Sequence, residues 1–155
     1  MDEAELCRIA AEIVGRAIAL KDFLTDEKTA SVGYCCIYCH DPEEYRARLT
    51  TAAGIGKIVR ETPTGPFILL REPIQTAAGS LHILKIRAPD PTHPELGHAD
   101  FTAADYRKLK KWALGREGFK LIVRKEHEMI ELKSPEFKDV RAYFPDPPIE
   151  TILGI

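Results

Sequence analysis

The chain lacks most of the features that mark the common functional classes. Its 22 lysines and arginines are balanced by 24 aspartates and glutamates, so the net charge of -2 gives no pull toward nucleic acid or a membrane surface. No apolar run approaches the roughly 20 residues of a membrane-spanning helix. No glycine-rich phosphate loop, GxSxG motif or HExxH motif is present. We therefore expect neither a nucleic-acid nor a membrane partner.

Cysteine is also scarce, with four residues, and three of them (Cys35, Cys36 and Cys39) crowd one short stretch. Such crowding does not suit a disulfide framework, and the acidic first residues MDEAEL argue against a secretory signal, so we expect a cytoplasmic protein with reduced thiols. Zinc is disfavoured because the neighbours Cys35 and Cys36 point to opposite sides of a strand and no second CxxC follows. Buried structural thiols are the favoured interpretation, and a reactive Cys36 facing a pocket is the alternative.

A proline-rich crossing organises the rest of the chain. Residues 79–100, GSLHILKIRAPDPTHPELGHAD, predict a strand, an irregular crossing and the start of a second strand, because three prolines within 88–97 exclude regular structure. The order strand–helix–strand–strand–strand is predicted on each side of the crossing. The expected fold is α+β, with two βαβββ modules forming a curved mixed sheet around a cavity. One compact domain then comprises an extra N-terminal helix and the two modules, at 1–28, 29–90 and 91–155.

The N-terminal helix is predicted at 3–24, where apolar residues recur on one face. We expect this stripe to pack on the outside of the first module, and a surface for a protein partner or a homodimer is the alternative. The third strand of the first module is predicted to end at Arg71, because Glu72 and Pro73 favour a loop.

Strand alternation predicts which side chains share a sheet face. If the aliphatic face packs on helices, the other face carries a polar, partly basic set of side chains. These are Tyr34, Tyr38, Lys85, Arg87, Glu131, Arg141 and Tyr143. Such a set suits a small anionic molecule, a carboxylate or phosphate, which Arg141 could grip through two donors. A solvent-exposed face with alternating charges is the alternative.

The histidines offer a possible metal site at the junction between the modules. His98 and Asp100 lie two residues apart on one face of a strand, which is suitable spacing for ligands, and His93 lies nearby. A solvated loop histidine is the alternative interpretation.

Three stretches of the chain resemble a known family. YCCIYCHDPEEYRARL, FILLREPIQTAAGSLHILKIRAPDPTHPELGHADF and DVRAYFPDPPIETIL are similar to the vicinal oxygen chelate superfamily of glyoxalase, bleomycin-resistance and extradiol dioxygenase proteins, and closest to its YecM-type members. The resemblance implies two half-sheets enclosing a cavity that holds a small ligand or a divalent metal ion.

The resemblance also implies where metal ligands would lie, on the first, fourth, fifth and last strands. The first three positions fall at Tyr34, Lys85 and Asp100, and the last strand offers no carboxylate, so Glu131 is the nearest candidate. A lysine cannot share a divalent cation's ligand shell. The candidate metal ligands are therefore His98, Asp100 and Glu131, and Lys85 is expected to form a buried charge pair with Asp100.

These patterns predict a small-molecule-binding protein of the vicinal oxygen chelate type. A metal-dependent isomerase or lyase is one form that it could take. The alternatives are a non-catalytic module that binds or sequesters a metabolite after losing its metal, and a protein-interaction domain that uses the N-terminal helix.

Overall fold

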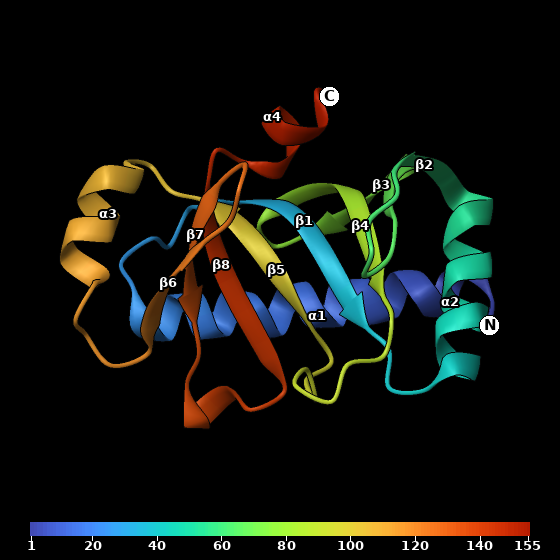
Figure 1. Ribbon diagram of the computed structural model, residues 1–155, viewed down its shortest axis with the longest axis horizontal. Coiled ribbons are helices and arrows are strands. Elements are labelled where there is room, and N and C mark those ends of the chain that lie inside the picture. The colour runs from blue at the N-terminus through green and yellow to red at the C-terminus, as the bar shows by residue number, and fades with distance from the viewer.

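The predicted α+β fold and element order are confirmed in the structure, a computed structural model that describes residues 1–155 (Figure 1). The helices are α1 (Glu3–Leu24), α2 (Pro42–Ile55), α3 (Tyr106–Ala113), α4 (Ile149–Leu153) and a 3-10 turn, η1 (Pro135–Phe137). The strands are β1 (Ser31–Tyr38), β2 (Gly56–Arg60), β3 (Phe67–Thr76), β4 (Gly79–Arg87), β5 (Gly97–Thr102), β6 (Phe119–Val123), β7 (Glu128–Leu132) and β8 (Val140–Asp146). None of the helices is both long enough and apolar enough to span a lipid bilayer.

The eight strands form one mixed sheet whose order reads alike from either end. The order is β2-β3-β4-β1-β5-β8-β7-β6, with β1 parallel to β4, β5 parallel to β8, and β1 antiparallel to β5 at the centre. Each half is therefore a βαβββ unit, related to the other by an approximate two-fold axis between β1 and β5. We call them the first half (β1–β4) and the second half (β5–β8).

The register shows which residues of the two halves are equivalent. Cys36 of β1 pairs with Lys85 of β4, and His98 of β5 pairs with Arg141 of β8. Cys36 and His98 also pair with each other across the centre. Lys85 and Arg141 thus occupy equivalent positions at the two ends of one row that crosses four strands.

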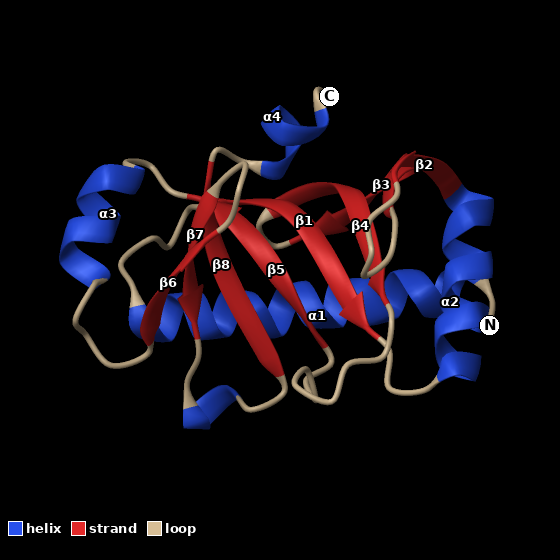
Figure 2. Ribbon diagram, viewed as in Figure 1, coloured by secondary structure: helices blue, strands red, loops and turns tan.

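Helix α1 covers one face of the sheet and reaches across both halves (Figure 2). Asp2 caps the helix by accepting a hydrogen bond from the Glu5 amide, and the helix ends where Thr25 bonds back to Lys21. Its buried stripe comprises Leu6, Ala10, Ile13, Val14, Ala17 and Leu20. Burial of each large aliphatic side chain contributes about 1.5–3 kcal/mol. The stripe belongs to the main hydrophobic core, so it is not available as the partner surface that we considered.

Strand β3 differs from the sequence prediction, because it continues through Pro73 to Thr76. Its pairing with β4 shifts register between Leu69 and Ile74, so the proline lies at an irregularity where no ladder hydrogen bond is required of it.

Candidate ligand-binding site

The face of the sheet opposite α1 gathers most of the polar residues singled out in the sequence. We call it the polar face. Its side chains are those of Tyr34, Tyr38, Lys85, Arg87, His98, Asp100, Glu131, Arg141 and Tyr143. All of them except the half-buried Arg87 are buried. The aliphatic residues of alternate parity point into the core beneath α1, as the alternation predicts. The polar face is therefore enclosed rather than solvent-exposed.

His98 lies at the centre of the polar face between two tyrosines. The Tyr34 hydroxyl is 2.9 Å from His98 Nε2, and the Tyr38 hydroxyl is 2.6 Å from Nδ1. Burial, reinforced by the charges of Lys85 and Arg87, lowers the pKa of His98 well below its usual value. A neutral imidazole has one donor and one acceptor, so one tyrosine donates to the ring and the other accepts from it. This residue is buried in β5 and is not a solvated loop histidine.

Asp100, next to His98 on the same face, has an unsatisfied oxygen. Its Oδ1 has no hydrogen-bond partner and lies 3.6 Å from His98 Nε2. Burial raises the pKa of Asp100 well above its usual value, and the negative charge of Glu150 raises it further, whereas Lys85 opposes the shift. Glu150 belongs to α4, and its Oε2 also lacks a partner. A Cβ on Gly33 would lie 3.6 Å from the Glu150 carboxylate, so Glu150 packs beside this residue of β1 at ordinary contact distance.

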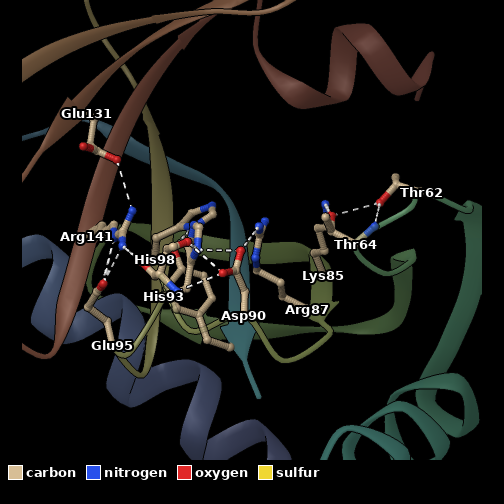
Figure 3. Close-up of polar contacts among 12 residues, drawn as sticks. Thr62, Thr64, Lys85, Arg87, Asp90, His93, Glu95, His98, Glu131 and Arg141 are labelled. Carbon is tan, nitrogen blue, oxygen red and sulfur yellow. Dashed lines mark hydrogen bonds and ion pairs between the residues drawn. The ribbon is translucent and has the colours of Figure 1, made fainter. Parts of the chain in front are cut away.

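Arg141 is held by the protein itself and not left free for a ligand, as Figure 3 shows. Its Nε donates to Glu95 at 2.8 Å. One terminal nitrogen lies 2.7 Å from Glu95 and donates to the Thr92 carbonyl, also at 2.7 Å. The other terminal nitrogen lies 3.4 Å from Glu131. Burial alone would lower the pKa of Arg141, but its hydrogen bonds to Glu95 and Tyr143 raise it above its usual value.

Glu95 was missed by sequence reasoning. It lies in the proline-rich crossing, where no periodicity assigns a side chain to a face, yet it is only 5% exposed. Nothing in the sequence distinguishes Glu95 from Asp90, the other carboxylate of the crossing.

Lys85 has no such carboxylate. Its ammonium donates to the Thr64 hydroxyl at 2.8 Å (Figure 3). It also lies 4.9 Å from the centroid of the Phe67 ring. Burial lowers the pKa of Lys85. The predicted pair with Asp100 is wrong: the two charges influence each other across the site, but no contact within 4.0 Å joins them. Each residue projects from its own side of β1, and that strand separates them.

The remaining basic residue, Arg87, is partly engaged. It lies 3.2 Å from Asp90, which also lies 3.0 Å from His93. Hydrogen bonds from Thr92 hold the pKa of Asp90 well below its usual range. The Arg87 Nε is buried without a partner. His93 therefore belongs to a cluster in the crossing and not to a shared site with His98 and Asp100.

The polar face does not fit a divalent metal ion. No group of three or more His, Cys, Asp or Glu side chains is placed to hold one. The three candidate ligands do not come together, because Glu131 accepts from Tyr143 at 2.7 Å and faces Arg141. Both ring nitrogens of His98 are engaged by tyrosines, so neither is free for a metal.

Helix α4 lies beyond one end of the strands, near the start of β1 (Figure 1), and packs on side chains of the polar face. Ile149 of α4 joins a second apolar cluster with Tyr34, Cys36, Tyr38, Phe67 and Ile83. Arg60 of β2 donates to the Ile152 carbonyl at 3.2 Å and ties the helix down. Cys36 is fully buried in this cluster, and burial raises its pKa to about 12, as befits a structural thiol.

Two cavities lie away from these residues. One of about 450 Å³ lies beside α3 and includes Arg107, Lys110 and Glu128, and another of about 350 Å³ lies near η1 and reaches Glu95. Neither is lined by Lys85 or Asp100.

No protein-family model and no curated protein sequence matches the chain. Among solved structures, a structural-genomics protein designated EC4020 has a TM-score of 0.65 at 17% identity, over 99% of this chain and 93% of that one. A glyoxalase/bleomycin resistance protein/dioxygenase superfamily member from Vibrio splendidus 12B01 has a TM-score of 0.44 at 14% identity, over 75% and 99%. An extradiol ring-cleaving dioxygenase from B. fuscum has a TM-score of 0.42 at 14% identity, over 78% and 35%. The chain thus shares its fold with EC4020 over nearly its whole length.

Proposed function

We propose that this chain is a small-molecule-binding protein of the vicinal oxygen chelate type that takes an anionic ligand on the polar face. The observation that carries the proposal is Lys85, a buried ammonium with no counter-ion. An unpaired buried charge is costly, and such groups in a protein interior call for an explanation. A ligand carboxylate beside Lys85 supplies one.

The second half supports this interpretation, because there the equivalent cation is neutralised internally. Glu131 pairs with Tyr143, two residues beyond Arg141, and so reaches the guanidinium. In the first half, Arg87 is two residues beyond Lys85 and is equivalent to Tyr143. Gly65 lies next to Arg87, at the position equivalent to Glu131. Gly65 has a φ of +133° and no side chain. A ligand carboxylate beside Lys85 would neutralise its charge, as Glu131 and Glu95 neutralise the charge of Arg141.

A ligand reaches Lys85 only if part of its cover moves. The candidate is α4, a five-residue helix whose Ile149, Ile152 and Leu153 pack on the second apolar cluster and whose Ile152 carbonyl accepts a hydrogen bond from Arg60. Short elements with few buried side chains open more readily than the core, and Ile149 is the only buried residue of α4. Ligand entry by displacement of α4 follows from this arrangement.

Calorimetric titration with butyrate and with inorganic phosphate tests the proposal. We expect at least one of these anions to bind to the wild type and to lose at least tenfold in affinity in Lys85→Met. Lys57→Met is the matched control, because Lys57 is exposed on β2 and its loss should change nothing. If neither anion binds, or if both variants bind like the wild type, the polar face is not an anion site.

Proton transfer, as in a metal-independent isomerase or lyase, is a second candidate function. It is favoured by the Tyr34–His98–Tyr38 chain of hydrogen bonds, in which a neutral imidazole can accept a proton from one side and release one to the other. NMR in D₂O would follow exchange of the protons next to the carboxylate of a bound acid. Exchange that is catalysed by the wild type and lost in His98→Gln supports this function, and exchange at the buffer rate rejects it.

A further inference from the structure

Two further groups on the polar face lack hydrogen-bond partners, and they lie on the other side of β1 from Lys85. Asp100 is 4% exposed and its Oδ1 has no partner, and Glu150 has a buried Oε2 that also has none. They come from β5 and α4, far apart in sequence. Their charges act on each other strongly enough that Glu150 is the largest neighbouring charge on Asp100. Two carboxylates without donors therefore face one region of the site.

We propose that the ligand, besides the anionic group bound at Lys85, carries a cationic nitrogen that binds at Asp100 and Glu150. The ligand class is thus an amino-carboxylate with its two charges at opposite ends. The inference rests on the proposed function for the anionic end and adds a separate recognition element for the other end.

The chemistry of the two carboxylates favours an ammonium over other donors. An ammonium has three donors and a positive charge, so it can satisfy both orphan oxygens and relieve the repulsion between them. A hydroxyl has one donor and no charge. A divalent metal ion is disfavoured because no third ligand from His, Cys, Asp or Glu is placed to complete the site.

The spacing favours a ligand with its charges well separated. Lys85 and Asp100 lie on strands that flank β1, and neighbouring strands are about 4.8 Å apart, so the two backbones are about 10 Å apart or more. The Lys85 ammonium contacts Thr64 and Phe67, on the side of β4 away from β1, so the lysine side chain does not shorten this gap. An acid with its amino group several carbons from the carboxylate fits, and an α-amino acid is too short.

Matched pairs of small molecules test the inference. We would titrate the full-length protein with 4-aminobutyrate against butyrate, and with 6-aminohexanoate against hexanoate. For at least one pair, the amino acid should bind at least tenfold more tightly than the plain acid. Asp100→Asn should abolish this difference, and Glu150→Gln should reduce it.

The outcomes separate the inference from the proposed function. If plain and amino acids bind equally, or if Asp100→Asn keeps the preference, the cationic subsite is rejected and the anion site stands. Butylammonium serves as a third probe: binding that survives Lys85→Met and is lost in Asp100→Asn supports the cationic subsite even if the anion site fails. If no probe binds to wild-type protein, both ideas are rejected. Thermal melts of each variant show whether it is folded.

Discussion

Lys85 and Arg141 occupy equivalent positions in the two halves of one sheet, yet their surroundings are opposite. Arg141 is enclosed by Glu95, Glu131 and a backbone carbonyl, whereas Lys85 has only a hydroxyl and an aromatic ring. The same strand pairing therefore supports two uses of a buried cation. In the second half the charge ties the crossing to the sheet, and in the first half it is left available. Repetition of topology does not imply repetition of role.

The largest expected effect comes from removing one cation from each half in turn. Arg141→Met should lower the free energy of unfolding by about 3–5 kcal/mol, because it strands two buried carboxylates. Lys85→Met should be neutral or stabilising, because it strands no charge. Urea denaturation of the two variants measures both values. A larger loss in Lys85→Met than in Arg141→Met would mean that Lys85 is the structurally paired cation and would overturn the comparison.

The two equivalent residues at the centre, Cys36 and His98, should differ in their response to acid. The pKa of His98 is lowered on folding, so between that value and about 6.5 the unfolded chain binds the extra proton. Stability is present above about pH 6.5 and is lost as pH falls, by up to about 1.4 kcal/mol per pH unit. Denaturation midpoints between pH 5 and 8 measure the slope. His98→Gln should flatten it, and an unchanged slope would assign it to other groups.

The titration of Asp100 should change stability with pH in the opposite direction. The pKa of Asp100 is raised on folding, so the folded protein holds this proton at pH values where the unfolded chain has lost it. The free energy of unfolding therefore falls as pH rises through the folded pKa. Asp100→Asn should therefore stabilise the ligand-free protein at pH 7 by about 1–2 kcal/mol, within the range for an unsatisfied buried group. Thermal melts at pH 4 and pH 7 check this. The gain should shrink at pH 4, and a gain that does not depend on pH would point to packing instead.

The smallest effect on stability is expected from giving the first half a carboxylate of its own. Thr64 already binds Lys85, so Thr64→Asp should create an ion pair like those of Arg141 and stabilise the fold by about 1 kcal/mol. The same change should weaken the binding of an anionic ligand at least tenfold, because its place is taken. Thr64→Asn, of nearly the same shape, is the control. Equal effects of the two substitutions would show that charge is not responsible.

Local patterns were sufficient for much of this architecture. The apolar period of residues 3–24 predicts the bounds of α1, and alternation along β1, β4 and β8 assigns side chains to the correct faces. Both signals depend on short-range geometry, which the sequence carries directly. Most residues of the polar face could therefore be identified before any contact was known.

The partners of those side chains could not be predicted in the same way. Glu95 reaches Arg141 because an irregular loop folds back over the sheet, and Glu150 reaches the site because the chain's end does so. Neither segment follows a periodic hydrophobic pattern from which its course could be predicted. The sequence-based pair of Lys85 with Asp100 is wrong for a related reason, since strand order alone does not give the distance between side-chain tips.

The placement of α1 has a consequence for the order in which the protein can be made. The helix precedes all eight strands and so leaves the ribosome before them, yet the strands that cover its apolar stripe extend to β8, the last of the eight. Until residue 146 has been synthesised, part of that stripe has no surface to pack on. Neither half-sheet can complete its core without this shared helix. During synthesis, the apolar stripe of α1 therefore stays partly uncovered until β8 has been made.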